Sequence, residues 1–388
     1  IKYSLADKKL EMKKWWKHQY TINNELSKNE WHENINIQLS KTLNLWTTSD
    51  VPIAFSLSGG LDSSALVAIA SINSSQRIKT YSLGFEGEGE EAWNELKIAR
   101  DVSRKYNTNH TEIILKPDNL ADSLEDMALH LEQPYAGGLP SWPLFQKIAK
   151  EYKVAIIGSG GDEIFGNYNR GKFFSQFNKG GFFKILDADL FQDSIQNAFF
   201  LMKERQANQI LKNNVPSIAN DLSHLLNRYN HNNVDDSIAQ LSIDSQLVDE
   251  FLMMTDRFSM ANSLEVRTPY LDHDLVSLLF SIPIKYRLDR DIYKIALRKS
   301  IGHLLPKSVL SAKKNGFKIP LSLWMRGHLR ALVEELVGQT ALNNSEFIKP
   351  DFYRNYVKPM LDGDNSNISL IWSVLMFQLW LSGANKLH

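Results

Sequence analysis

The residues with the clearest chemical potential form the run Ser58-Gly59-Gly60-Leu61-Asp62-Ser63-Ser64. Its two glycines allow positive φ angles and let backbone N–H groups approach an anion closely. The serine hydroxyls add donors, and a helix starting here would direct its free N–H groups at the same anion. The carboxylate of Asp62 suits bound phosphate when a cation lies between them, and Mg²⁺ binds carboxylate and phosphate oxygens together. The run therefore predicts a phosphate-binding loop with a Mg²⁺ ligand at Asp62.

Such a loop needs a strand before it and a helix after it. Residues 51–57 are a short apolar run, typical of a buried strand, and residues 62–72 have a helical pattern. The alternation continues with expected strands at 78–85, 110–115 and 154–158 and expected helices at 31–46, 91–106 and 141–152. Units of this kind predict the α/β class, a parallel twisted sheet with helices on both faces. A ligand is then expected at the carboxyl ends of the strands.

The rest of the chain suggests how it is organised. Residues 1–30 are polar and are expected to be a linker or arm, and residues 31–388 to be one domain. Within that domain we expect an α/β core at about 50–170, a helical insertion at about 171–240 and a helical part at about 241–388. One apolar stripe in the last part is predicted to be core, comprising Leu247, Phe251, Met254, Phe258 and Ala261.

Composition narrows the function. Lys and Arg number 44, and Asp and Glu also number 44, so the formal net charge is zero and nucleic acid is not an expected partner. The chain has no cysteine, which excludes disulfides, thiolate metal sites and a Cys nucleophile. The strongest apolar stretch, 368–381, is shorter than the roughly 20 residues of a membrane span. We therefore expect a buried helix there, no membrane partner, and a cytoplasmic location.

The loop at 58–64 resembles the pyrophosphate loop of N-type ATP pyrophosphatases. Four further segments resemble motifs of the asparagine synthetase family, in the same order and with similar spacing. They are Gly158-Ser-Gly-Gly-Asp-Glu-Ile-Phe-Gly-Asn-Tyr168, Glu132-Gln-Pro134, Asp256-Arg-Phe-Ser-Met-Ala-Asn-Ser-Leu-Glu-Val-Arg-Thr-Pro-Tyr-Leu-Asp272, and Lys294-x-x-Leu-Arg298 with Leu305-Pro306 and Lys313-Lys-Asn-Gly-Phe317. The resemblance covers about residues 35–380 and identifies the C-terminal synthetase domain of that family.

The resemblance implies a reaction and a set of residues. A carboxylate, aspartate in the family, attacks the α-phosphate of MgATP to give an acyl-adenylate and pyrophosphate, and ammonia from glutamine then displaces AMP. Lys314 would face the reacting phosphate. Lys294 and Arg298, which are expected on one helix face, would hold pyrophosphate. Asp62 and Asp162 would bind Mg²⁺. The implied ATP-binding residues are Leu57, Ser58, Gly59, Gly60, Leu61, Asp62, Ser63 and Ser64, with backbone groups of Leu57, Leu83 and Gly158 against adenine and ribose.

Two further charged residues, Glu265 and Arg267, are flanked by apolar residues. They suggest either a structural ion pair or a substrate contact. Ser159 stands where the family usually has an acid linked to attack by the amine, which makes it a candidate substrate residue and leaves aspartate specificity open.

Other departures keep alternatives open. The family's glutaminase half, with its Cys nucleophile, is absent from these residues, so an upstream glutaminase domain is an expected partner. The alternatives are a β-lactam synthetase or lasso-peptide macrocyclase type of enzyme, a tRNA-modifying relative, and a non-catalytic nucleotide-binding subunit. Oligomeric state is open, with a homodimer as one option.

Overall fold

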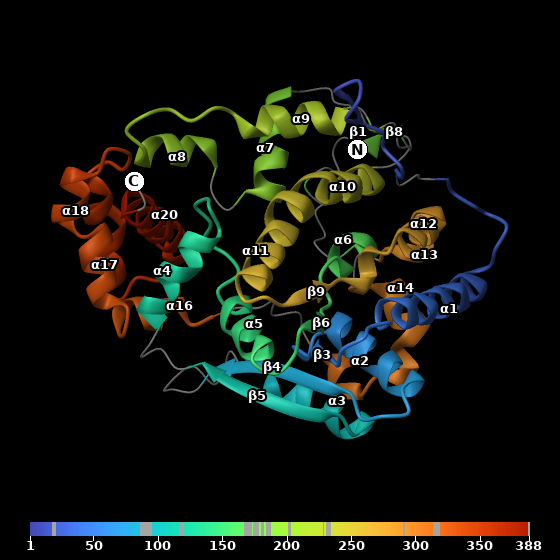
Figure 1. Ribbon diagram of the computed structural model, residues 1–388. Helices are drawn as coiled ribbons and strands as arrows, with labels where there is room; N and C mark the ends of the chain where they lie inside the picture. Colours follow the sequence, from blue (N-terminus) through green and yellow to red (C-terminus); the bar gives the residue numbers. More distant parts are fainter. Residues whose placement is uncertain are drawn as a thin grey trace.

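The computed structural model describes residues 1–17, 21–85, 95–115, 120–166, 173, 178–179, 182–183, 188–200, 203–227, 229, 234–289, 292–312 and 319–386. At its centre is a five-stranded parallel sheet in the order β5-β4-β3-β6-β9 (Figure 1). The strands are β3 (Ile53–Ser56), β4 (Lys79–Phe85), β5 (Asn109–Leu115), β6 (Val154–Ile156) and β9 (Glu265–Arg267). The α/β class with a parallel sheet is thus confirmed.

The order of the strands reverses at β3. The chain adds β4 and β5 on one side of β3 and then returns to its other side to form β6. Ile53 of β3 pairs with Val154 of β6, and Ala54 of β3 pairs with Lys79 of β4. The loops that follow β3 and β6 therefore leave the same edge of the sheet next to each other. This is a topological switch point, where open α/β sheets bind ligands.

The two faces of the sheet pack into different hydrophobic clusters because successive strand residues point to opposite sides. Ala54 and Ala155 belong to one buried cluster, whereas Phe55 and Ile156 belong to the other. The first cluster is completed by α4 (Leu120–His130), α5 (Ser141–Ala149), α11 (Met253–Ala261) and the C-terminal helices. The second is completed by α1 (Lys28–Trp46), α2 (Leu61–Asn73), α3 (Leu96–Tyr106), α6 (Gly161–Phe165), α12 (His273–Ser281), α14 (Ile295–Ile301) and α15 (Lys307–Ser311).

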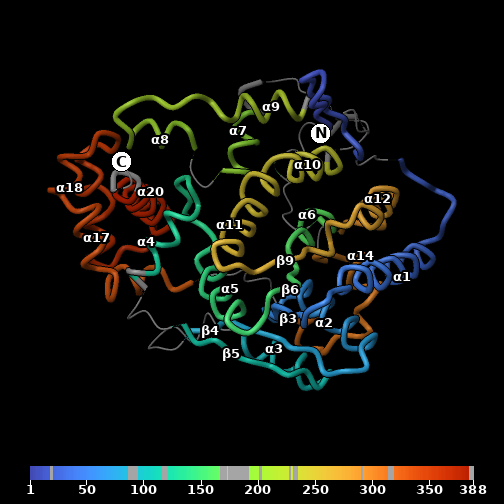
Figure 2. Tube along the Cα trace, viewed as in Figure 1, coloured from blue at the N-terminus to red at the C-terminus, as the bar shows by residue number. Residues whose placement is uncertain are grey.

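The edge strand β9 is a correction to the sequence analysis. The prediction of a mostly helical part at 241–388 did not include the strand at Glu265–Arg267, which pairs in parallel with β6. The two strands lie more than a hundred positions apart in the sequence and side by side in space (Figure 2). A segment of three residues is too short for the alternating pattern of a strand to be recognised in the sequence. The segment forms a strand because it pairs with β6.

Between β6 and β9 the chain forms a mostly helical region. Its elements are β7 (Asn178–Lys179), β8 (Phe182–Phe183), α7 (Ala188–Phe199), α8 (Glu204–Ile210), α9 (Ile218–Asn227), α10 (Val234–Ser242) and the π-helix η4 (Ile243–Leu252). A small buried cluster of its own joins α7, α9 and α10 through Ile195, Leu226 and Leu241. Helix η4 runs directly into α11, so this region continues into the core without an intervening loop.

The C-terminal residues form a helical layer against the first cluster. Its elements are α16 (Leu321–Arg326), α17 (Arg330–Val337), α18 (Gln339–Asn344), η7 (Tyr353–Val357), α19 (Lys358–Leu361) and α20 (Ile368–Lys386). In α20 the side chains of Ile371 and Leu375 are fully buried, as expected for a core helix. Within the described residues, no helix combines the length and apolar character that a membrane crossing requires.

The first residues form a hairpin of β1 (Lys2–Ser4) and β2 (Lys9–Glu11) and then an extended segment. The rings of Trp15 and Trp16 lie 5.6 and 6.5 Å from the ring of His273, at the start of α12. Helix α1 then begins with a capping box between Ser27 and Glu30. The remaining short elements are η5 (Pro269–Leu271), α13 (Ile284–Arg287) and η6 (Gly302–Leu304).

Candidate active site

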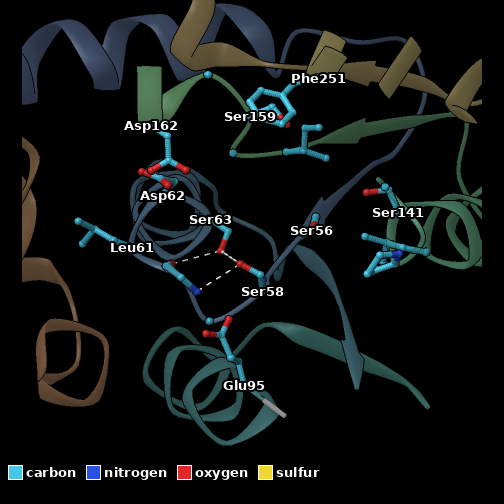
Figure 3. A pocket seen from close by; sticks show the side chains of 18 of the residues that line it. Ser56, Ser58, Leu61, Asp62, Ser63, Glu95, Ser141, Ser159, Asp162 and Phe251 are labelled. Atoms are coloured by element: carbon cyan, nitrogen blue, oxygen red, sulfur yellow. Dashed lines mark hydrogen bonds between the residues drawn. The ribbon is translucent and has the colours of Figure 1, made fainter. Parts of the chain in front are cut away.

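The first loop of the site joins β3 to α2. Its serines bond to one another: the hydroxyl oxygens of Ser58 and Ser63 are 2.9 Å apart, and the Gly60 N–H donates to Ser58 Oγ over 3.2 Å (Figure 3). Gly59 has a φ of +85°, and a Cβ there would lie 2.9 Å from the carbonyl oxygen of Glu95. The loop therefore has a fixed shape that requires glycine. Its backbone leads into the N-terminus of a 13-residue helix, which favours bound phosphate.

The second loop follows β6 and contacts the first. It is held at its start by the Ile157 N–H, which donates to the carbonyl oxygen of Arg267 in β9 over 3.0 Å. A Cβ on Gly158 would lie 3.1 Å from Asp62 Cβ, and a Cβ on Gly161 would lie 2.7 Å from Asp62 Oδ1. Glycine at both positions thus lets the loops approach until Asp62 and Asp162, in the first turn of α6, face each other (Figure 3).

A buried lysine joins these two carboxylates. The Nζ atom of Lys294 lies 2.5 Å from Asp62 Oδ2 and 2.8 Å from Asp162 Oδ1, and its side chain is 0% exposed. Burial alone would lower the pKa of Lys294, but the charges of Asp62 and Asp162 outweigh it and raise this pKa above its usual value. Lys294 also has a φ of +49°, which a non-glycine residue seldom adopts.

Arg298 behaves differently from Lys294. Its Nε donates to the carbonyl oxygen of Tyr293 and its Nη1 to that of Leu310, each over 2.7 Å, while its guanidinium lies on the Tyr293 ring. The prediction that Lys294 and Arg298 share one helix face needs correction. Helix α14 begins at Ile295, and the left-handed backbone of Lys294 directs its side chain to the carboxylates. Arg298 instead lines the cavity.

Both loops border a cavity of about 390 Å³. Ten of the residues expected in the site line it: Ser58, Gly59, Gly60, Leu61, Asp62, Ser63, Gly158, Ser159, Asp162 and Arg298. Four of the expected residues are buried and are not among the described lining residues: Leu57, Ser64, Leu83 and Lys294. The side chains of Leu57 and Ser64 are fully covered. Lys314 lies outside the described residues.

The cavity also has lining residues that the sequence analysis missed. Among them are Ser56, Glu95, Tyr135, Ser141, Phe251, Met254 and Tyr293. Tyr135 directly follows the Glu132-Gln-Pro134 segment, which is a signal of nearby loop structure, whereas Glu95 falls inside the helix expected at 91–106 and directly precedes α3 in the structure. Burial raises the pKa of the Glu95 carboxyl, which lies across the phosphate loop from Asp162 (Figure 3).

The stripe predicted as core is only partly core. Leu247, Met254 and Phe258 are buried, Phe251 is half-buried, and Ala261 is exposed. Met254 belongs to the first core cluster and also lines the cavity, so the prediction is wrong only for Phe251, which is half-buried and lines the cavity, and for Ala261. The π-helical turns of η4 shift the register that the helical spacing assumed.

Glu265 and Arg267 form a structural ion pair. Arg267 Nε lies 2.6 Å from Glu265 Oε1, and the two side chains are 20% and 58% exposed. Arg267 Nη1 also donates to the carbonyl oxygens of Trp46 and Thr48 over 2.8 Å each, which ties β9 to the end of α1. Neither residue is among those described as lining the cavity, which favours the structural alternative over a substrate contact.

The site fits Mg²⁺ by its donor chemistry. Two carboxylates converge on a single cationic group, and carboxylate oxygens are the protein ligands this ion prefers. Gly158 and Gly161, in the loop after β6, both lie close against Asp62. Asp62 and Asp162 are therefore the residues that could hold the metal beside a bound phosphate.

A glycine-rich loop at the switch point of a parallel sheet defines the class of protein, an α/β protein with a cavity bordered by the loops that follow β3 and β6. The model of the asparagine synthase family matches residues 34–382, and the chain belongs to this family. Asparagine synthetase [glutamine-hydrolyzing] 1 of Bacillus subtilis is 25% identical over 371 residues, 88% of this chain and 57% of that protein. A putative asparagine synthetase [glutamine-hydrolyzing] of Mycobacterium tuberculosis is 26% identical over 368 residues, 86% of this chain and 54% of that protein.

Asparagine synthetase [glutamine-hydrolyzing] 3 of Bacillus subtilis is 29% identical over 288 residues, 69% of this chain and 45% of that protein. The chain thus spans about half the length of the curated relatives it matches.

Proposed function

We propose that this chain is the synthetase part of an ATP-dependent amide ligase. It would adenylate a carboxylate at the phosphate loop and then transfer the acyl group to an amine, with release of AMP and pyrophosphate. The observation that carries the proposal is the meeting of Asp62 and Asp162 above the Ser58–Ser64 loop. Membership of the asparagine synthase family supports the reaction type.

In the first step a carboxylate oxygen attacks the α-phosphorus of ATP. The bond from that phosphorus to the oxygen bridging to the β-phosphate breaks, and pyrophosphate leaves with the bonding electrons. The backbone N–H groups after Gly59 and the hydroxyls of Ser58 and Ser63 would hold the leaving pyrophosphate. Mg²⁺ held by Asp62 and Asp162 would neutralise charge on the phosphates.

The remaining roles come from the resemblance and the contacts together. Lys314 is proposed to face the α-phosphate, and Arg298 to contact phosphate from the cavity wall. Lys294 touches both carboxylates and is proposed to set their positions rather than to bind pyrophosphate directly. Backbone groups of Leu57, Leu83 and Gly158 remain proposed contacts of adenine and ribose.

In the second step the amine nitrogen attacks the acyl carbon, loses a proton and displaces AMP. The names of the relatives make aspartate and ammonia from glutamine the reference substrates. Residues 1–388 contain no cysteine, so glutamine hydrolysis through a thioester would need a glutaminase outside these residues. We propose that the enzyme works in the cytoplasm, where ATP and Mg²⁺ are supplied.

Exchange of labelled pyrophosphate into ATP tests the first step. The 388-residue chain should catalyse exchange that depends on Mg²⁺ and on an added carboxylic acid, starting with aspartate. Asp62→Asn should abolish it, while Asp249→Asn, an exposed substitution on η4, should not. No exchange with any acid in a panel of amino, dicarboxylic and aliphatic acids would refute the ligase proposal.

A second candidate keeps the chemistry and changes the substrates. Ser159 occupies the position of the family's usual acid and lines the cavity. A hydroxyl at this position would suit an enzyme that joins a different carboxylate and amine, such as a β-lactam synthetase or a lasso-peptide macrocyclase. The acid that best supports exchange distinguishes the two candidates.

A further inference from the structure

The carboxylate of Asp62 is covered at both of its oxygens. Asp62 Oδ2 lies 2.5 Å from Lys294 Nζ. Asp62 Oδ1 is buried beside Gly161, where an added Cβ would come within 2.7 Å of it. The Tyr270 hydroxyl donates to the carbonyl oxygen of Asp62 over 3.0 Å and so holds the backbone of this residue. A metal ion that binds this carboxylate must therefore compete with the ammonium group of Lys294.

The second carboxylate contacts the same ammonium group. Asp162 Oδ1 lies 2.8 Å from Lys294 Nζ, and the side chain of Asp162 is 25% exposed whereas that of Lys294 is 0% exposed. Asp62 and Asp162 face each other across the site (Figure 3). Because Lys294 contacts one oxygen of each, its charge lies between the two carboxylates, where a cation shared by both would bind.

The surroundings of Lys294 hold it in this position. Its backbone is left-handed, helix α14 begins at the next residue, and the centroid of the Tyr293 ring lies 5.2 Å from its Nζ. Burial opposes the charged form of Lys294, but Asp62 and Asp162 outweigh burial and raise its pKa above the usual value. The lysine therefore keeps its positive charge at neutral pH.

The charges of these three groups bear on how a divalent cation can bind. The ammonium group cancels half of the negative charge of the two carboxylates. A positive charge close to a cation site weakens the binding of that cation. A bound nucleotide would add negative charge and oxygen ligands, and Mg²⁺ is commonly held by one or two carboxylates together with substrate phosphates.

We propose that Lys294 keeps the affinity of Asp62 and Asp162 for a free divalent cation low, so that the chain takes up Mg²⁺ together with ATP and not alone. The inference rests on the proposed function, because it takes these two carboxylates as the metal ligands beside the phosphates. It adds to that function a role for Lys294 in deciding when the metal ion binds.

Binding of Mn²⁺, followed by electron paramagnetic resonance, tests the inference without any turnover. Mn²⁺ prefers the same oxygen ligands as Mg²⁺, and the signal of free Mn²⁺ falls as the ion binds. Without nucleotide, the parent chain should bind Mn²⁺ with a Kd above about 0.1 mM. Lys294→Gln should lower this Kd by at least ~10-fold, because the competing positive charge is lost.

Three further variants assign the effect to this site. Lys299→Gln, which removes an exposed charge from the same helix, should leave the Kd for Mn²⁺ within about twofold of the parent value. Lys294→Arg keeps the positive charge and should bind Mn²⁺ as weakly as the parent chain. Adding Asp62→Asn to Lys294→Gln should abolish the gain in affinity, because a charged metal ligand is lost.

The dependence on nucleotide is measured with α,β-methylene-ATP, which cannot be cleaved at the bond that the proposed reaction breaks. Mn²⁺ should tighten the binding of this analogue to the parent chain by at least ~10-fold in equilibrium dialysis. Since binding linkage is reciprocal, the analogue then tightens the binding of Mn²⁺ by the same factor.

The outcomes separate the inference from the proposed function. Mn²⁺ binding by the nucleotide-free parent chain with a Kd well below 0.1 mM would overturn the inference, and this measurement needs no variant to fold. An unchanged Kd in folded Lys294→Gln, a gain that survives Asp62→Asn, or analogue binding that ignores Mn²⁺ would also overturn it. Failure of the parent chain to bind the analogue, with or without Mn²⁺, would instead refute the proposed function.

Discussion

The Nζ atom of Lys294 lies 2.5 Å from Oδ2 of Asp62, although the two residues are more than two hundred positions apart in the sequence. The same nitrogen lies 2.8 Å from Asp162 Oδ1. One ammonium group thus connects the loop after β3, the loop after β6 and the start of α14. Without this ammonium group, the carboxylates of Asp62 and Asp162 would face each other without the positive charge that now contacts both.

Replacing the lysine should therefore loosen the site. We expect Lys294→Met to lower the free energy of unfolding by about 2–4 kcal/mol, since it leaves two partly buried carboxylates without their ammonium partner. Mg²⁺ should restabilise this variant more than the parent chain, because the ion replaces the lost charge. Urea unfolding with and without Mg²⁺ measures both effects. Lys299→Met, an exposed change in the same helix, is the control, and equal Mg²⁺ responses would contradict the prediction.

Asp62→Asn should preserve the fold and remove the activity. The amide keeps the shape of the side chain, and the bond from the Tyr270 hydroxyl to the carbonyl oxygen of residue 62 does not involve the carboxylate. Pyrophosphate exchange should fall by at least ~10²-fold because a charged metal ligand beside the leaving group is lost. Circular dichroism and exchange on the same preparation test this. A folded variant with normal exchange would place Asp62 outside the metal site.

Gly161→Ala should disturb the site through shape alone. The added Cβ would lie 2.7 Å from Asp62 Oδ1, so the carboxylate must leave its present position. We expect exchange to drop by at least ~10-fold, since small displacements of positioned groups have large effects on rate. Gly302→Ala is the control, because its Cβ would meet Leu310 Cδ2 at an ordinary 3.6 Å. Similar rates for both variants would mean that the site adapts freely to the methyl group.

The dependence of stability on pH should include a contribution from His110 in β5. Burial lowers the pKa of this imidazole below 6.5, although Glu112 partly opposes the effect. As the pH falls below about 6.5, the unfolded chain takes up a proton that the folded chain resists, so the free energy of unfolding decreases. His110→Gln should flatten this decrease between about pH 7 and 5 in urea titrations. The control His303→Gln, a substitution of an exposed residue, should leave the dependence of the free energy of unfolding on pH unchanged. The same pH dependence in both variants would argue against a contribution from His110.

The sequence predicted the centre of the fold well because its signals there are local. The expected strand at 154–158 corresponds to β6 at Val154–Ile156, and the expected helix at 62–72 to α2 at Leu61–Asn73. A short apolar run followed by glycines and then a helical pattern needs no distant partner to be recognised. The loop at 58–64 followed from the same signals, whereas Asp162 entered as a site residue only through the family resemblance.

The features that escaped prediction depend on distant contacts. The three residues of β9 form a strand only against β6. Phe251 has the spacing of a core residue, yet the π-helical turns of η4 direct it toward the cavity. Lys294 has the spacing of a helix residue, yet its positive φ sends it to two carboxylates. In each case tertiary packing overrides a local pattern.

The position of β9 also has a consequence for the order in which the molecule can assemble. Strands β3, β4, β5 and β6 are all complete in the first 156 residues of the chain. The carbonyl oxygen that holds the Ile157 N–H belongs to Arg267, so it leaves the ribosome more than a hundred residues later. A nascent chain could thus form most of its sheet while the loop bearing Asp162 still lacks its anchor. We expect nucleotide binding competence to be acquired late in synthesis, after an early and inactive sheet.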